Sequence, residues 1–382
     1  MPTNNSSPDV IVIGGGVIGL AIGWRALRRG LAVTLVERGE PGAGTSRVAA
    51  GMIAPVAEAA LAEQRLLALS LASARAYPAF VAELRDESGI DPAYLPCGTL
   101  MVARDTDEAA VLGRELELRQ RLGLAVRRVT PTEARRLEPA LAPTLRGALE
   151  FPDDRAIDPR ALTRALVVAF TRAGGRLVTG EAARLLRSNE TVTGVELNDG
   201  TRIEAGATVL AAGPWSGELA GLPDEVRIPL RPVKGQILGL RDPSGPGMLQ
   251  RVVRMQPGYL VPRGDGRYAL GASVEERGFD TTVTAGPVFE LLRDAIELVP
   301  GLSELVIEEL NAGTRPGTAD NMPALGPGAL AGLHWAVGHY RHGILLTPVT
   351  AEIVVAALCG EPPSELAQSA SPERLTAPVV HA

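Results

Sequence analysis

The segment Asp9–Glu37 constrains the fold of this chain more strongly than any other part of the sequence. Its first part, Val10–Ile13, is a short apolar run typical of a buried parallel strand. Glycines with the spacing G-x-G-x-x-G follow, and then come an apolar-periodic helix that ends near Gly30 and a second strand, Ala32–Val36. This order predicts a βαβ unit of the Rossmann type, which binds the pyrophosphate of an adenine dinucleotide.

Each glycine of the turn has a separate physical role. Gly14 permits the tight turn, Gly16 lets the backbone approach a pyrophosphate, and Gly19 lets the helix lie close to the strand. The N-terminus of the helix offers free N–H groups and the positive end of its dipole to the phosphates. Glu37 lies about 18 residues beyond Gly19, near the spacing at which a carboxylate accepts hydrogen bonds from a ribose.

Composition narrows the class of protein. A length of 382 residues suggests two domains, or one large domain with an insertion. The formal net charge of −6 and the aromatic content of 3% argue against nucleic acid as a partner. Cys97 and Cys359 are too few for a disulfide framework, and no cluster of His, Cys and acidic residues predicts a metal site. Because no signal peptide or long apolar stretch is seen, we expect a cytoplasmic protein that does not enter a membrane.

The periodicity of the remaining chain predicts an α/β fold, α+β overall. Strands that run into glycines recur at Val209–Gly213 and Trp335–Gly343, so one Rossmann-like domain is expected to combine distant segments. Helices are expected over Val56–Glu87, with a break or kink at Pro78, and over Ile344–Cys359.

Two discontinuous domains follow from this pattern. We expect a dinucleotide-binding domain over residues 1–88, 150–225 and 316–370. An interleaved antiparallel-sheet domain over 89–149 and 226–315 would bind the substrate. Residues 371–382 would be a tail, and the first eight residues and the chain after about Ala370 are expected to be disordered.

The loop Pro41–Gly51, PGAGTSRVAAG, favours FAD over NAD as the dinucleotide. Small residues let such a loop pass beneath a bulky ring system, and its backbone N–H groups can donate to the ring. The alternative for this loop taken alone is a plain surface loop.

Further motifs complete a resemblance to the D-amino-acid oxidase-like FAD oxidoreductases, and among these to the glycine oxidases of thiamine biosynthesis. The resemblance runs from Asp9 to about Cys359. It is carried by IGGGVIGLA (Ile13–Ala21), ERG (Glu37–Gly39), TSRVAAGM (Thr45–Met52), LAAGPWS (Leu210–Ser216), PVKGQ (Pro232–Gln236), GYLVPR (Gly258–Arg263), GTRPGTADNMPALG (Gly313–Gly326) and GHYRHGILLTPVTAEIV (Gly338–Val354).

The resemblance implies a non-covalent FAD and a set of residues around it. Neither cysteine falls in the flavin-facing segment, where covalent attachment would need one nearby. The FAD-binding residues implied are Gly14, Gly15, Gly16, Val17, Ile18, Gly19, Glu37, Arg38, Thr45, Ser46, Ala50, Gly51, Met52, Ala183, Ala212, Gly213, Trp215, His339, Tyr340, Arg341, His342, Gly343, Ile344 and Leu345.

The same resemblance implies a carboxylate-binding substrate site. Arg315 would hold a planar carboxylate through two parallel N–H bonds, Arg341 would contact the substrate, and Tyr259 would add a hydroxyl. Val274 stands where glycine oxidases carry a methionine near the substrate, which would alter the width of the pocket. The alternatives are solvated surface charges for the arginines and a packed strand residue for Tyr259.

The reaction implied is oxidative deamination of glycine, sarcosine or small D-amino acids. A neutral amine would bind, its Cα hydride would pass to flavin N5, and water would convert the imine to a 2-oxo acid and ammonia. Dioxygen would reoxidise the flavin and form hydrogen peroxide. No acid–base residue is required, because positioning and the flavin supply the chemistry.

Three alternatives stay open at the level of sequence. One is a dehydrogenase of the same family that passes electrons to a quinone or partner protein. The second is a flavin-binding subunit without catalysis, and the third is binding of NAD alone. Lys234, the only lysine, could favour oxygen reduction if it lies near the flavin. A homo-oligomer, a tetramer as in relatives, is implied by resemblance alone.

Overall fold

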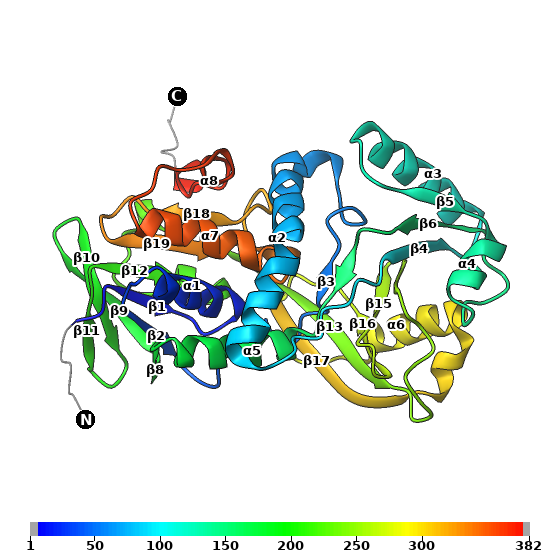
Figure 1. The fold of residues 1–382 in the computed structure, drawn as a ribbon, viewed down its shortest axis with the longest axis horizontal. Coiled ribbons are helices and arrows are strands. Elements are labelled where there is room, and N and C mark those ends of the chain that lie inside the picture. The colour runs from blue at the N-terminus through cyan, green and yellow to red at the C-terminus, as the bar shows by residue number, and fades with distance from the viewer. Residues whose placement is uncertain (1–6, 377–382) are drawn as a thin grey trace.

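The computed structural model describes residues 7–376. Two large sheets lie at opposite ends of an elongated molecule, and the long helix α2 (Gln64–Ser88) stands between them (Figure 1). The first sheet has six strands, in the order β18-β19-β12-β1-β2-β8. These strands are β18 (Ala324–Pro327), β19 (Leu333–Val337), β12 (Ala207–Leu210), β1 (Val10–Ile13), β2 (Val33–Glu37) and β8 (Arg176–Thr179).

The N-terminal βαβ unit forms the centre of this sheet. Strand β1 pairs in parallel with β2 and β12, and helix α1 (Val17–Arg28) begins directly after the glycine turn. Gly14 has φ of +112°, and a Cβ there would lie 2.5 Å from the carbonyl oxygen of Ala211. A Cβ on Gly19 would overlap the carbonyl oxygen of Gly14. Both glycines therefore have the steric roles predicted for them.

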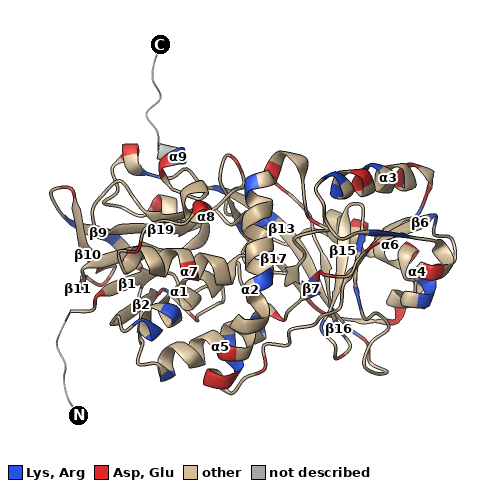
Figure 2. Cartoon of the chain, turned by 45° about the horizontal axis from the view of Figure 1, so that its top comes forward, with Lys and Arg blue, Asp and Glu red and all other residues tan. Residues whose placement is uncertain are grey.

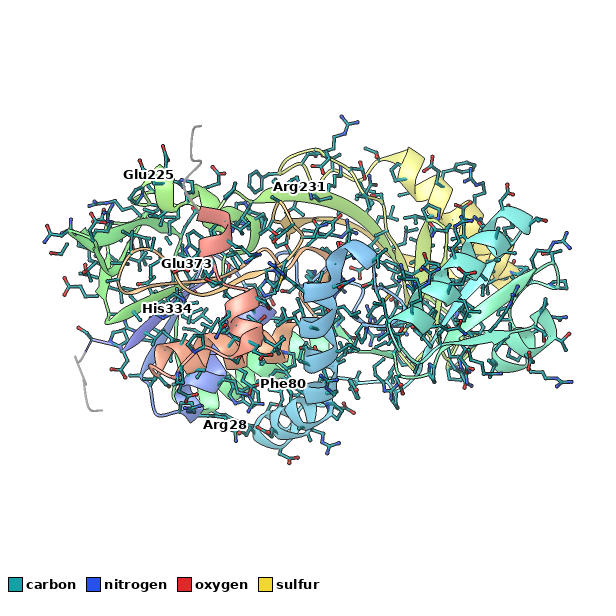
Figure 3. All side chains as sticks on the ribbon, turned by 90° about the horizontal axis from the view of Figure 1, so that it is seen from above. Arg28, Phe80, Glu225, Arg231, His334 and Glu373 are labelled. Carbon is teal, nitrogen blue, oxygen red and sulfur yellow. The ribbon has the colours of Figure 1, made fainter. Side chains whose placement is uncertain are left out.

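Helices cover one face of the six-stranded sheet and a small antiparallel sheet covers the other. Apolar side chains of α1, α2, α5 (Pro159–Arg172) and α7 (Thr347–Leu358) bury the first face. Figure 3 labels Phe80 on α2 and Arg28 at the end of α1, where these helices meet. The other face lies against β9 (Ala182–Ser188), β10 (Thr191–Leu197) and β11 (Arg202–Glu204).

The second large sheet has eight strands, in the order β17-β13-β16-β15-β14-β4-β6-β5. Neighbouring strands are antiparallel except for β14 and β4, which are parallel. Helix α6 (Ala285–Leu298) buries its apolar face against this sheet. The strands are β17 (Val306–Gly317), β13 (Arg231–Arg241), β16 (Arg267–Gly271), β15 (Gly258–Pro262), β14 (Val252–Met255), β4 (Thr99–Ala103), β6 (Gly147–Phe151) and β5 (Arg127–Val129).

Smaller elements complete the fold. Strands β3 (Met52–Ile53) and β7 (Arg155–Ala156) pair where the chain passes between the two large sheets. Helices α3 (Thr106–Arg121) and α4 (Pro131–Leu137) lie at the far end of the second sheet and carry charges of both signs (Figure 2). Together, the parallel Rossmann-like sheet and the largely antiparallel sheet confirm the predicted fold class, whereas the domain limits stay a prediction.

Two helix limits predicted from sequence are wrong. The helix expected over Val56–Glu87 begins only at Gln64, because buried polar side chains hold the segment 54–60 in an irregular path. Pro78 lies inside α2 without ending it. The final helix begins at Thr347, because Tyr340–His342 form a short 3₁₀ turn before it.

The C-terminal segment is more ordered than expected up to residue 376. Helices α8 (Glu365–Ser369) and α9 (Glu373–Thr376) follow α7, and the Arg374 guanidinium lies 2.9 Å from a carboxylate oxygen of Asp320. The prediction of disorder after Ala370 is therefore wrong for residues 371–376, which this ion pair holds against the fold. The disorder predicted for residues 1–6 and 377–382 lies outside the described residues. Within residues 7–376, no helix is long and apolar enough to cross a membrane.

Candidate active site

A single elongated cavity of about 630 Å³ joins the two large sheets. It runs from the glycine turn after β1 to the inner strands of the eight-stranded sheet, and its volume lies in the range of cofactor and ligand sites. Most of the predicted cofactor residues line it, although they come from five separated parts of the chain. Those that line it are Gly14, Gly16, Val17, Ile18, Glu37, Arg38, Thr45, Ser46, Ala50, Gly51, Met52, Ala212, Gly213, Trp215, His339, Tyr340, Arg341, Gly343 and Ile344.

The remaining five predicted cofactor residues do not line the cavity. Gly15 lies in the turn before α1, and Gly19 lies in the first turn of α1. Leu345 is buried in the helical layer. Gly180, Glu181 and Ala182 line the cavity where Ala183 was expected. His342 is buried behind the segment that does line it.

The glycine-rich end of the cavity is arranged for a nucleotide. Glu37 accepts hydrogen bonds from the backbone N–H of Gly15 at 2.7 Å and of Gly39 at 3.1 Å. The hydroxyl of Ser46 accepts one from the N–H of Val17, at 3.1 Å, in the first turn of α1. The Glu37 carboxylate and the Ser46 hydroxyl are therefore both fixed against the glycine turn and the first turn of α1, where both line the cavity.

The segment 338–345 forms one wall of the cavity and is held by α2 and α7. The Ser73 hydroxyl donates to the carbonyl of Leu345 at 2.6 Å, and the Tyr77 hydroxyl donates to that of Ile344 at 2.8 Å. His339 Nε2 lies 3.0 Å from the hydroxyl of Thr350, and burial lowers its pKa to about 3. The wall is therefore held to two helices by hydrogen bonds. His339 is uncharged near neutral pH.

Arg315 is the cation at the other end of the cavity. Its Nη1 donates to the carbonyl of Ser273 at 3.1 Å and more weakly to that of Lys234 at 3.4 Å. Among residues 7–376, no carboxylate lies within 4.0 Å of this guanidinium. Arg315 is therefore positioned by backbone carbonyls while its charge stays available to a ligand.

Tyr259 and Val274 lie at the same end. Tyr259 pairs with Gly271 across β15 and β16, and burial raises the pKa of its hydroxyl although Arg315 opposes the shift. Val274 lines the cavity and is 68% exposed. Tyr259 is thus a neutral hydroxyl beside a free guanidinium, as a carboxylate site requires.

Arg341 differs from Arg315. Its Nη2 lies 2.5 Å from a carboxylate oxygen of Glu63, and its side chain is 30% exposed. The charge of Arg341 is therefore already balanced at the rim of the cavity. To contact the substrate, the Arg341 guanidinium would have to bind Glu63 and the substrate together, or leave Glu63.

Among the lining residues that the sequence reading missed, Glu58 and Arg254 form an ion pair. Glu58 and Arg254 both face the cavity, and the Arg254 guanidinium lies 3.6 Å from a Glu58 carboxylate oxygen. The signal for Glu58 is a single acid in the otherwise apolar run MIAPVAEAAL that follows the FAD loop. Arg254 has no such signal, because it is one of the many arginines of the chain and lies in a short strand, β14.

Lys234 does not line the cavity. Its ammonium lies 2.8 Å from a carboxylate oxygen of Asp280 and 3.9 Å from one of Glu275. The side chain is 1% exposed. The lysine instead ties β13 to the segment that follows β16.

Comparison with known proteins identifies the family. The family model described as FAD dependent oxidoreductase (DAO) matches residues 9–357. The chain therefore belongs to this family of FAD-dependent oxidoreductases. Its two large sheets, with a cavity lined from both, agree with this assignment.

Individual relatives agree with this assignment. The glycine oxidase of Geobacillus kaustophilus is 36% identical over 91% of each chain. Its crystal structure superposes with a TM-score of 0.89, at 34% identity, covering 98% of this chain and all of that one. The bifunctional protein ThiO/ThiG of Synechocystis sp. is 36% identical over 97% of this chain but 54% of its own length. The chain thus spans about half of that two-part relative.

The residues present fit an FAD. The glycine turn, the N-terminus of α1 and Glu37 suit the adenosine pyrophosphate, while the small-residue loop 41–51 and the wall 338–345 leave room for a flat ring between the two sheets. The protein is an FAD-dependent oxidoreductase, and Arg315 lines the same cavity.

Proposed function

We propose that this protein oxidises glycine and other small amines that carry a carboxylate, such as sarcosine and small D-amino acids. The observation that carries the proposal is Arg315, whose guanidinium faces the cavity without a carboxylate partner among the described residues. The 36% identity to a glycine oxidase over nearly the whole chain supports this substrate class. The enzyme is on this view an FAD-dependent amino-acid oxidase.

The chain's own residues bind and orient the substrate. Bound FAD supplies the acceptor for the hydride that leaves the substrate Cα. Arg315 would hold the carboxylate and Tyr259 would donate its hydroxyl to the same group, which would orient the substrate in the cavity. The substrate loses two electrons and becomes an imine, which water hydrolyses to a 2-oxo acid and ammonia. Dioxygen takes up the electrons and yields hydrogen peroxide.

A place in thiamine biosynthesis is part of this proposal. Several relatives are ThiO/ThiG proteins, in which a segment resembling this chain is joined to a second part. Oxidation of glycine would supply an imine to such a pathway. Assembly as a homo-oligomer and residence in the cytoplasm stay predictions from resemblance.

Peroxide formation tests the proposal. The purified protein, with its FAD, is mixed in air with glycine, sarcosine, D-alanine, D-proline and their L-isomers where these exist. Peroxide with glycine, sarcosine or the D-isomers is expected. Bleaching of the flavin without oxygen, but no peroxide in air, would instead identify a dehydrogenase with another acceptor. If no amine bleaches the flavin, the proposal that Arg315 binds the carboxylate of an amine substrate is wrong.

A further inference from the structure

Glu58 is a buried carboxylate whose hydrogen-bonding capacity is unused. Its side chain is 10% exposed and lines the cavity. One oxygen lies 3.6 Å from the Arg254 guanidinium and the other lies 3.4 Å from His342 Nδ1. Neither contact is a hydrogen bond, and no residue from 7 to 376 donates one to this carboxylate. A carboxylate in this setting needs N–H or O–H donors, and the cavity is the side from which they can come.

The segment that carries Glu58 is held in place from both sides. Arg119, from α3, donates to the carbonyls of Val56 at 3.1 Å and Ala57 at 2.8 Å. Asp154 accepts hydrogen bonds from the N–H groups of the same two residues, both at 3.3 Å. Because Arg119 and Asp154 are fully buried, they hold an irregular segment that aims one acid into the cavity.

Glu58 carries a negative charge despite its burial. Burial raises its pKa, but the guanidinium groups of Arg254, Arg341 and Arg315 lower it by more, so the pKa lies below its ordinary value. His342 is neutral, because burial lowers its pKa to about 4, and neither of its ring nitrogens has a hydrogen-bond partner. The cavity thus holds an anionic acceptor, Glu58, at the same end as the free cation Arg315.

We propose that Glu58 is the ammonium subsite of the active site, so that the substrate binds as a zwitterion between Glu58 and Arg315. An ammonium group has three N–H donors, which match the open acceptor positions of this carboxylate. The carboxylate of the same molecule pairs with Arg315. The proposal rests on the proposed function, and it replaces the expectation that the amine binds neutral. One ammonium proton then passes to the Glu58 carboxylate before the Cα hydride leaves.

This subsite predicts a preference that Arg315 alone does not. Arg315 recognises any small carboxylate, including hydroxy acids. A site with Glu58 favours an amino acid over the hydroxy acid of the same skeleton, because only the ammonium is attracted by the negative charge. The ratio of the two dissociation constants therefore measures how much Glu58 contributes to binding of the ammonium group.

The test uses two ligands that differ only in this group. 2-Aminoisobutyrate and 2-hydroxyisobutyrate share one skeleton and have no Cα hydrogen, so neither can reduce the flavin. Dissociation constants are measured from the flavin absorbance of the holoenzyme near neutral pH, for the wild type, Glu58→Gln and Glu117→Gln. The last variant makes the same charge change on the surface of α3, where Glu117 pairs with Arg121 and with no other cation of residues 7–376.

The wild type is expected to bind the amino acid at least about tenfold more tightly than the hydroxy acid. Glu58→Gln should abolish the preference while keeping the affinity for the hydroxy acid, and Glu117→Gln should keep the preference. An unchanged preference in Glu58→Gln, or an equal loss of affinity for both ligands, would overturn the proposal.

If Glu58→Gln does not retain FAD, the dissociation constants of the wild type alone test the proposal. A wild type that binds the hydroxy acid as tightly as the amino acid, yet oxidises glycine, refutes the ammonium subsite and leaves the proposed function standing. A wild type that binds neither ligand and oxidises no amine refutes both.

Discussion

The guanidinium of Arg119 donates to the carbonyl oxygen of Ala57 at 2.8 Å, across a distance of 62 positions in the chain. The same group also donates to the carbonyls of Val56 and Ala59. One buried side chain from α3 thus donates to three backbone acceptors in an irregular segment. The segment leads from the FAD loop to α2 and presents Glu58, so a helix at the far end of the molecule positions part of the active site.

Replacing Arg119 is therefore expected to destabilise the protein and weaken substrate binding together. Arg119→Met removes a buried donor shared by three carbonyls, of which that of Val56 keeps the N–H of Ala59 and that of Ala57 keeps Arg254, and the free energy of unfolding should fall by about 2 kcal/mol. Chemical denaturation measures this loss, and the KM for glycine reports the site. Arg121→Met removes an arginine of the same helix whose side chain is 77% exposed, and it should cost less than about 0.5 kcal/mol. Equal effects of the two changes would contradict this role.

Asp154 should make stability depend on pH. Burial raises the pKa of this carboxyl from 3.8 to about 7 in the folded protein. Between these two values the folded state binds more protons than the unfolded state, so the contribution of Asp154 to stability falls as pH rises from about 4 to 7. Asp154→Asn cannot titrate and should lose this part of the slope. Thermal unfolding of both proteins from pH 5 to pH 8 measures it.

The neighbouring change Asp153→Asn is the control, because Asp153 is exposed. Its profile should follow that of the wild type. If Asp154→Asn also follows the wild type, the carboxyl of Asp154 does not titrate in this range.

Gly235 provides the space for Arg315. A Cβ at this position, on β13 opposite Gly313, would overlap the guanidinium of Arg315. Gly235→Ala is expected to push the guanidinium out of place and raise the KM for glycine by about tenfold, with a smaller change in kcat. Gly147→Ala is the matched control, since a Cβ there meets no atom within 4 Å. Unchanged kinetics in Gly235→Ala would show that Arg315 can move without loss.

Lys234 should not affect the reaction with oxygen. Its ammonium is buried against Asp280, at 2.8 Å, and is not part of the cavity. Lys234→Met is expected to leave the rate of flavin reoxidation by dioxygen within about twofold of the wild type. Stopped-flow mixing of the reduced enzyme with oxygenated buffer gives this rate. A loss of tenfold or more would restore the oxygen role that the sequence suggested.

The sequence was sufficient where chemistry is encoded in short motifs. The glycine turn, Glu37 and Arg315 lie in local patterns whose steric and electrostatic roles can be argued without a structure, and the structure places them at two ends of one cavity. Glu58 has only a weak signal of this kind, a single acid in an apolar run. Its unused acceptors become visible only once Arg119, Asp154 and Arg254, all distant in sequence, are seen around it. The late start of α2 has the same cause, since tertiary hydrogen bonds override helical periodicity there.

Arg341 illustrates a second limit of the sequence. Its motif resembles that of a substrate-binding arginine, but the pattern does not reveal that Glu63 already balances its charge. Whether a cation is free depends on which carboxylates the fold brings near it. Arg315 and Arg341 therefore look equivalent in sequence and differ in the structure.

The most direct test compares peroxide formation from glycine by the wild type and by Arg315→Ala, with Arg341→Ala alongside. Loss of the charge-assisted contact should raise the KM for glycine by about 100-fold in Arg315→Ala, and by much less in Arg341→Ala because Arg341 is already paired. Peroxide from the wild type together with this ranking is the expected result. Wild-type activity that survives Arg315→Ala unchanged would contradict the carboxylate site on which the proposed function depends.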